Sequence, residues 1–162
     1  MKKELLAGII GALLVMVPVQ AEEIWRPYPA FLEAVCLVES SNGKWIRGDG
    51  GKSLGDFQIG RAAWDDVSQW RKARGWQTYD YRKNVLNRKI NRLYAADYLT
   101  ILRNQLLDIL KREPTAAELY AAYNMGMANF SECRYRLARV NATTARKCQV
   151  IETFLISNRS KG

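Results

Sequence analysis

A long helical pattern between Val85 and Lys111 constrains the fold more than any other stretch of the sequence. Apolar residues recur there at steps of three and four, at Leu86, Ile90, Leu93, Tyr94, Tyr98, Ile101, Leu102, Leu106 and Leu110. Pro114 ends the pattern, because proline cannot continue a helix. We therefore expect one long central helix. Asp97 interrupts its apolar face and needs a partner if that face is buried.

Shorter helical patterns flank this stretch and predict a mainly α domain. One runs from Gly60 to Arg74, and a second begins at the capping box formed by Thr115 and Glu118. A last helix is expected from about Thr144 to Ser157. Residues 44–58 are rich in glycine and predict a small extended or β-hairpin segment.

The first 21 residues have the composition of a secretory signal peptide. Lys2 and Lys3 are basic, Leu5 to Val19 is apolar, and Ala21 ends a small-residue cleavage pattern. The apolar run is shorter than the roughly 20 residues of a membrane-spanning helix. An uncleaved anchor is the alternative. We expect residues 22–162 to form one soluble, monomeric domain that is secreted or periplasmic.

Net charge and composition limit the partners and the catalytic groups that this chain can use. The chain carries 25 Lys and Arg against 16 Asp and Glu, a net charge of +9, which predicts attraction to a polyanion. It contains no histidine, so Ser-His or Cys-His catalysis and His-rich zinc sites are excluded. Carboxylate chemistry is left, with no metal or other cofactor expected. A nucleic-acid partner is disfavoured by the signal peptide and by the lack of a binding motif.

Glu39 is the candidate catalytic residue. It prolongs an apolar helical stripe formed by Leu32, Val35 and Cys36, so its carboxyl group is expected to be partly desolvated, which favours the protonated form that a general acid needs. Helix-stopping residues 40–43 follow at once, with Gly43 suited to a left-handed cap. The sequence therefore predicts a cleft between a helix end and a glycine-rich turn.

Three short motifs, in this order and spacing, resemble those of lytic transglycosylases and goose-type lysozymes, in the lysozyme-like superfamily. They are Glu39-Ser40-Ser41, Gly55-Asp56-Phe57-Gln58-Ile59 and Ala122-Tyr123-Asn124-Met125-Gly126. The ordered set brackets most of the mature chain, about residues 28–130. The resemblance implies a mainly α, α+β lysozyme-like fold in which residues 44–58 line the cleft.

The resemblance also implies a reaction. Lytic transglycosylases cut the MurNAc-GlcNAc β-1,4 bond of peptidoglycan glycan strands with a single glutamate and form 1,6-anhydro ends; here that glutamate is Glu39. Positions matching substrate-binding residues are Ser40, Ser41, Gly55, Phe57, Gln58, Tyr123 and Asn124. Without the resemblance, Tyr123 would be interpreted as a core residue and Asn124 as a helix cap.

Two other functions stay open. A hydrolytic muramidase needs a second carboxylate beside Glu39, and Asp49 and Asp56 are the candidates. From another class, a cell-wall-binding protein could keep the fold without activity.

Aromatic and cysteine residues give two further predictions. Trp76, Tyr79 and Tyr81 are candidates for stacking on sugar rings or for packing at the base of their loop. The chain has three cysteines, and we favour a disulfide between Cys133 and Cys148, with Cys36 buried as a small apolar residue. A Cys36–Cys133 bridge is the alternative.

Overall fold

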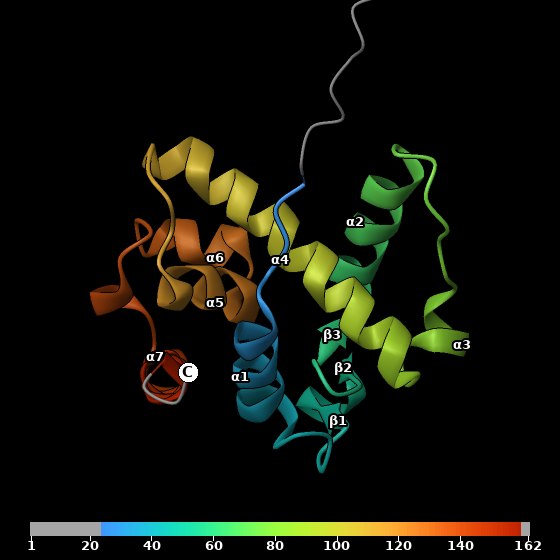
Figure 1. Ribbon diagram of the computed structural model, residues 1–162, viewed down its shortest axis with the longest axis horizontal. Coiled ribbons are helices and arrows are strands. Elements are labelled where there is room, and N and C mark those ends of the chain that lie inside the picture. Colours follow the sequence, from blue (N-terminus) through green and yellow to red (C-terminus); the bar gives the residue numbers. More distant parts are fainter. Residues whose placement is uncertain (1–23, 160–162) are drawn as a thin grey trace, which may run out of the picture.

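The computed structural model describes residues 24–159, which fold into a mainly helical structure with a small antiparallel sheet at one side (Figure 1). The predicted signal peptide lies outside this range. In chain order the elements are α1 (Pro29–Ser40), β1 (Arg47–Gly48), the 3₁₀ helix η1 (Asp49–Gly51), β2 (Ser53–Leu54), β3 (Ile59–Gly60), α2 (Arg61–Lys72), α3 (Tyr81–Asn84), α4 (Arg88–Leu110), α5 (Ala116–Met125), α6 (Met127–Glu132), η2 (Leu137–Arg139) and α7 (Ala142–Arg159).

The predicted central helix is present as α4, the longest helix of the described residues. Asn87 caps its start by accepting hydrogen bonds from two backbone N–H groups, and Lys111 ends it with a left-handed φ of 56°. Figure 1 shows α4 crossing the molecule, with α2 and α5 packed against it. The predicted capping box is also confirmed, because Thr115 and Glu118 each bond the other's backbone N–H at the start of α5.

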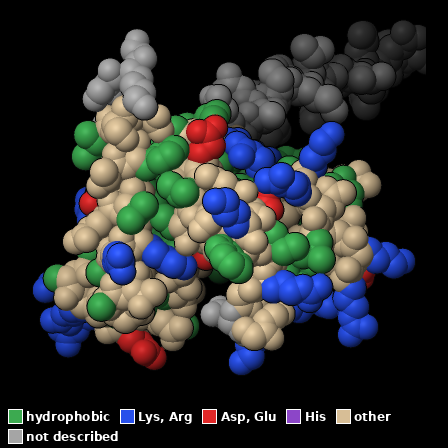
Figure 2. Space-filling view, turned by 90° about the horizontal axis from the view of Figure 1, so that it is seen from below, with side chains coloured by type: hydrophobic (Ala, Val, Ile, Leu, Met, Phe, Trp, Pro, Cys, Tyr) green, Lys and Arg blue, Asp and Glu red, His purple; other side chains and the backbone are tan. Residues whose placement is uncertain are grey.

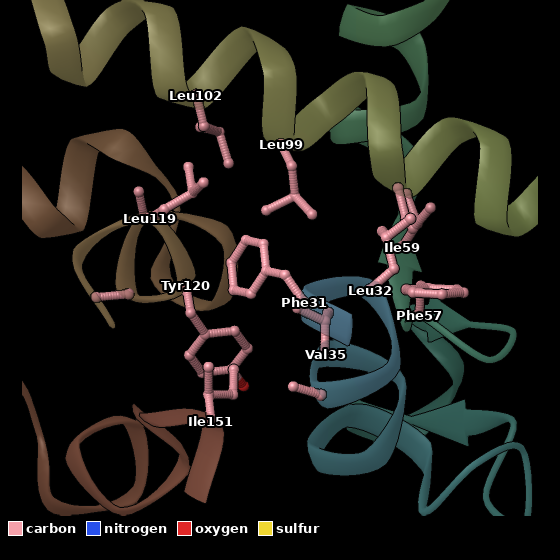
Figure 3. Packing of buried hydrophobic residues seen from close by; sticks show 14 of the residues in the cluster. Phe31, Leu32, Val35, Phe57, Ile59, Leu99, Leu102, Leu119, Tyr120 and Ile151 are labelled. Carbon is pink, nitrogen blue, oxygen red and sulfur yellow. The ribbon is translucent and has the colours of Figure 1, made fainter. Parts of the chain in front are cut away.

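The core lies between α1 and its neighbours (Figure 3). Phe31 and Val35 of α1 point toward Leu99 of α4 and Tyr120 of α5, and all four are almost fully buried. Helix α7 packs against both α1 and α5. This packing fixes α1, and therefore Glu39 in its last turn, against α5 and α7.

The expected extended segment is a three-stranded antiparallel sheet in the order β1-β2-β3. Asn91 of α4 anchors its last turn by accepting from Phe57 N at 2.9 Å and donating to Leu54 O at 3.3 Å. A Cβ on Gly55, where φ is +81°, would meet the Asn91 amide nitrogen at 2.4 Å. Glycine is therefore required at Gly55, and the sheet is tied to the central helix.

Helix α1 ends in a left-handed turn that joins it to the sheet. Ser41 is the cap residue, with φ 52°, where the sequence suggested Gly43. Ser40 is buried, and its Oγ donates to Asp56 O at 2.7 Å and accepts from Gly43 N at 2.8 Å. These bonds hold the end of the helix against the turn that precedes β3.

Asp97 is buried in the apolar face of α4 and is paired with two arginines. Its side chain is fully buried, and Arg26 and Arg71 each donate to one carboxylate oxygen. The Arg26 guanidinium also lies over the rings of Trp70 and Trp76. This cluster fastens the segment before α1 to α2 and α4.

The predicted disulfide between Cys133 and Cys148 is wrong, since both residues, like Cys36, are free thiols. Each of the two thiols instead lies 3.4 Å from a backbone carbonyl, that of Arg139 for Cys133 and that of Ala117 for Cys148. Burial raises the pKa of the Cys148 thiol to about 11, which keeps it protonated. Within residues 24–159, no helix is both long and apolar enough to cross a bilayer.

Candidate active site

Glu39 lies in the wall of a polar pocket of about 370 Å³. The pocket is bounded by the end of α1, the sheet, α5 and α7, and its lining residues are Glu39, Gly48, Ser53, Gln58, Tyr123, Asn124, Asn141, Thr143, Thr144 and Lys147. The Glu39 side chain is 7% exposed. The carboxyl group is thus largely shielded from water but borders a space that a ligand can enter.

Two neutral donors from α5 hold one oxygen of Glu39. The Tyr120 hydroxyl donates to Oε1 at 2.5 Å, and Asn124 Nδ2 donates to the same oxygen at 3.3 Å. Burial and the nearby Glu39 charge raise the pKa of Tyr120, so the hydroxyl stays protonated as a donor. Tyr120 was not among the predicted site residues.

The C-terminal helix supplies the other contacts. Lys147 Nζ lies 3.3 Å from Glu39 Oε2, and Thr144 Oγ1 donates to Asn124 Oδ1 at 2.9 Å. Because Thr144 occupies the amide oxygen of Asn124, the amide nitrogen is directed to Glu39. Neither Thr144 nor Lys147 was predicted as a site residue, although the sequence predicted the helix that carries them.

Tyr123 lines the pocket but does not bond Glu39. Its hydroxyl donates to Phe57 O at 2.7 Å, which joins α5 to the turn before β3. Desolvation, followed by the charge of Glu39, raises the pKa of Tyr123 well above its ordinary value. Tyr123 therefore positions the wall of the pocket, while Tyr120 contacts the carboxyl group.

Gln58 lines the pocket, and neighbouring backbone carbonyls hold its side-chain amide. Its backbone has a φ of 48°, and its Nε2 donates to Gly55 O at 2.7 Å and Trp45 O at 3.0 Å. Its Oε1 is buried and accepts no hydrogen bond from the described residues. A Cβ on Gly48 would lie 2.3 Å from this Oε1, so the glycine leaves room for the amide.

Asp56, one of the two candidate second carboxylates, lies in a different environment from Glu39. Asp56 does not line the pocket; its Oδ2 accepts from Arg88 Nε at 2.7 Å, and its side chain is 10% exposed. Asp49 belongs to η1, but its side chain lies outside the described part of the structure. Among the described residues that line the pocket, Glu39 is the sole carboxylate.

Four other predicted substrate-binding residues do not line the pocket, namely Ser40, Ser41, Gly55 and Phe57. Ser40, Gly55 and Phe57 are buried in the junction between α1, the sheet and α4, while Ser41 caps α1. These residues hold together the elements that carry the lining residues.

The three aromatic residues Trp76, Tyr79 and Tyr81 are likewise absent from the pocket lining. Tyr81 donates to Ile59 O at 3.3 Å, Tyr79 lies against Tyr94, and Trp76 packs edge-on against Trp70. The packing interpretation of this loop is therefore the one that the contacts support.

The arrangement can move a proton at Glu39 Oε2, the oxygen that has no neutral donor and that the Lys147 ammonium group contacts. Residues 24–159 contain no group of three acidic, cysteine or histidine residues placed to hold a metal ion. Comparisons with protein-family models, curated proteins and solved structures found no match for this chain.

Proposed function

We propose that the protein is a lytic transglycosylase that cuts the MurNAc-GlcNAc β-1,4 bond of peptidoglycan with Glu39 as its single acid and base. One observation carries the proposal: Glu39 is the sole carboxylate among the described residues lining the pocket, and neutral donors hold only one of its oxygens. The second oxygen has no neutral donor and contacts only the Lys147 ammonium group, so in this proposal it is the oxygen that exchanges a proton with a bound sugar once that contact opens. The resemblance of the three motifs supports the same function.

The reaction needs one proton that leaves Glu39 and returns. Protonated Glu39 donates to the glycosidic oxygen, and the bond from that oxygen to the muramoyl C1 breaks. The substrate's own acetamido oxygen stabilises the positive charge at C1. Glu39, now a carboxylate, takes the proton of the muramoyl 6-hydroxyl. The 6-oxygen attacks C1 at the same time. The ring closes as a 1,6-anhydro end, without consuming water.

The surrounding residues have separate tasks in this proposal. Tyr120 and Asn124 fix the carboxyl group in one orientation through Oε1, which places Oε2 toward the substrate. The net positive charge draws the protein to the anionic wall. A secreted or periplasmic monomer fits this substrate.

Hydrolysis is the competing outcome, and the contacts of Asp56 disfavour it. A water-activating carboxylate must face the bond, whereas Asp56 is paired with Arg88 outside the pocket lining. Asp49 is the other candidate for that role.

The test is mass spectrometry of fragments released from purified peptidoglycan by the wild type, Glu39→Gln and Glu33→Gln. Glu33 is an exposed glutamate of the same helix, so its variant controls for the loss of one charge. We expect fragments one water lighter than hydrolysis products, absent with Glu39→Gln and unchanged with Glu33→Gln. Ordinary reducing ends would establish hydrolysis instead. A folded wild-type protein that releases no fragments but sediments together with insoluble peptidoglycan would be a cell-wall-binding protein instead.

A further inference from the structure

Lys147 is the sole cation among the described residues that line the pocket. It reaches Glu39 Oε2 from α7 at 3.3 Å, and 29% of its side chain is exposed. The other described residues of the lining, apart from Glu39, carry no formal charge. Glu39 and Lys147 therefore form an isolated ion pair in a polar pocket.

The proposed reaction cannot proceed with this pair unchanged. Glu39 must carry a proton when the glycosidic bond breaks, and a protonated carboxyl group has no charge for Lys147 to balance. Lys147 also contacts Oε2, the oxygen that would deliver the proton. The lysine has a flexible four-carbon stem and a partly exposed side chain, so its ammonium group can leave Glu39 while its backbone stays in α7.

An ammonium group that leaves Glu39 needs another anion, and the substrate class supplies one. The muramoyl residue carries a branch at its 3-oxygen that ends either in the lactyl carboxylate or in the carboxylates of a stem peptide. The face of the molecule in Figure 2 carries many Lys and Arg side chains, which attract any anionic strand. Lys147 differs from them because it lies beside the catalytic carboxyl group.

We propose that Lys147 moves from Glu39 to a carboxylate on the muramoyl branch and thereby selects glycan strands that carry this carboxylate. The inference rests on the proposed function and adds a specificity determinant to it. Binding of the anionic branch separates the ion pair, which frees Oε2 to protonate the glycosidic oxygen. Strands without a carboxylate leave the pair intact and are cleaved slowly.

The experiment compares strands before and after carbodiimide amidation, which converts carboxylates to neutral amides and keeps the sugar chain. Two forms are used, peptide-bearing strands and strands stripped of peptide by an amidase, which expose the lactyl carboxylate. Cleavage is measured as kcat/KM for the wild type, Lys147→Gln, Lys147→Arg and Lys89→Gln. Lys89 is an exposed lysine at the start of α4, so its variant matches the charge change outside the pocket.

We expect amidation to lower kcat/KM of the wild type and of Lys89→Gln by about tenfold. Lys147→Gln should cleave both forms of a strand equally, and Lys147→Arg should keep much of the wild-type preference. If amidation lowers kcat/KM on stripped strands, the anion that Lys147 binds is the lactyl carboxylate. If amidation lowers kcat/KM only on peptide-bearing strands, the anion belongs to the stem peptide.

Two results would overturn the inference. One is a wild type that cleaves untreated and amidated strands equally, and the other is a Lys147→Gln variant, folded by circular dichroism, that keeps the full preference. In both cases the proposed function stands, because untreated strands are still cut. A wild type that releases nothing from untreated strands would instead overturn the proposed function and the inference with it.

Discussion

Two regions of the molecule each bury a carboxylate, and their partners differ. Asp97, in the middle of α4, has a fully buried side chain with one arginine on each oxygen. Glu39, at the end of α1, is 7% exposed and is held by a tyrosine, an asparagine and one lysine. Both oxygens of Asp97 are paired with arginine, whereas the second oxygen of Glu39 contacts only Lys147, whose side chain is 29% exposed.

The other buried acidic residues also differ from Glu39 in that their partner is an arginine. Asp56 is paired with Arg88, and Glu118 with Arg112. Arginine provides a planar fork that fixes a carboxylate by charge and geometry, which suits a structural role. In this chain, carboxylates paired with arginine hold the fold, and the one paired with neutral donors and lysine faces the pocket.

The strongest test of this comparison is to remove the charge from Glu39 and from Asp56 in separate variants. We expect Glu39→Gln to lower peptidoglycan cleavage by about a thousandfold, because the proton donor is lost. Asp56→Asn should stay within about tenfold of the wild type, since Asp56 does not line the pocket. The measurement is fragment release per folded molecule. Equal losses in both variants would make Asp56 the second carboxylate and the reaction a hydrolysis.

Asp97→Asn should lower the stability of the fold, whereas Glu39→Gln lowers activity. Removing one charge from the buried cluster leaves Arg71, with a side chain only 9% exposed, without its anion, and should lower the free energy of unfolding by about 3 kcal/mol. Denaturant unfolding measures it. The matched control is Asp65→Asn, in an exposed pair with Arg61, which should leave the unfolding midpoint unchanged. An Asp97→Asn protein as stable as the wild type would contradict the structural role.

The fold was largely predictable because its signals are local. The three- and four-residue steps along α4 and the capping box of α5 lie within single segments, and both are confirmed. The sheet was predicted only as an extended segment. Its anchor is Asn91, which reaches back 34 residues to Phe57, and no local pattern indicates such a bond.

The candidate site was only partly predictable for the same reason. Glu39 was predicted from the apolar stripe before it and the helix-stopping residues after it, and Gln58 from the resemblance of its motif. Tyr120 was missed because it falls among apolar residues of a helix, although its spacing of four from Asn124 places both on one face. Lys147 contacts Glu39 across 108 residues, and one lysine in a basic chain gives no signal.

Tyr120→Phe tests whether the neutral donors of Glu39 serve catalysis. The substitution removes the hydroxyl from Oε1 but keeps the buried ring, so we expect kcat to fall by about tenfold with little change in KM. Tyr123→Phe is the control, since its hydroxyl bonds Phe57 O and not Glu39. It should lower the free energy of unfolding by about 1–3 kcal/mol, because a shielded carbonyl loses its donor. Equal kcat losses in both variants would remove the distinction between the two tyrosines.

The smallest effect concerns Glu118, which tests whether an arginine-paired carboxylate stabilises the fold in the way that the comparison requires. The Arg112 guanidinium, which donates to both carboxylate oxygens, holds the pKa of Glu118 below its ordinary value of 4.5. Because the folded state binds its proton more weakly than the unfolded state, the stabilisation is complete above the ordinary pKa. It is lost as the pH falls through the lower pKa of the folded protein.

Thermal unfolding of the wild type and Glu118→Gln between pH 6 and pH 3 measures this effect. We expect the variant to melt lower at pH 6 and the two melting temperatures to draw together as the pH falls through the lowered pKa of Glu118 in the folded protein, below which Glu118 is protonated in both states. The glutamine can still accept from Thr115 N, as Glu118 Oε2 does at 2.8 Å, so the difference isolates the charge rather than the helix cap. Melting curves that stay parallel across this range would show that the Arg112 pair contributes nothing through its charge, and the division between structural and catalytic carboxylates would then rest on Asp97 and Asp56.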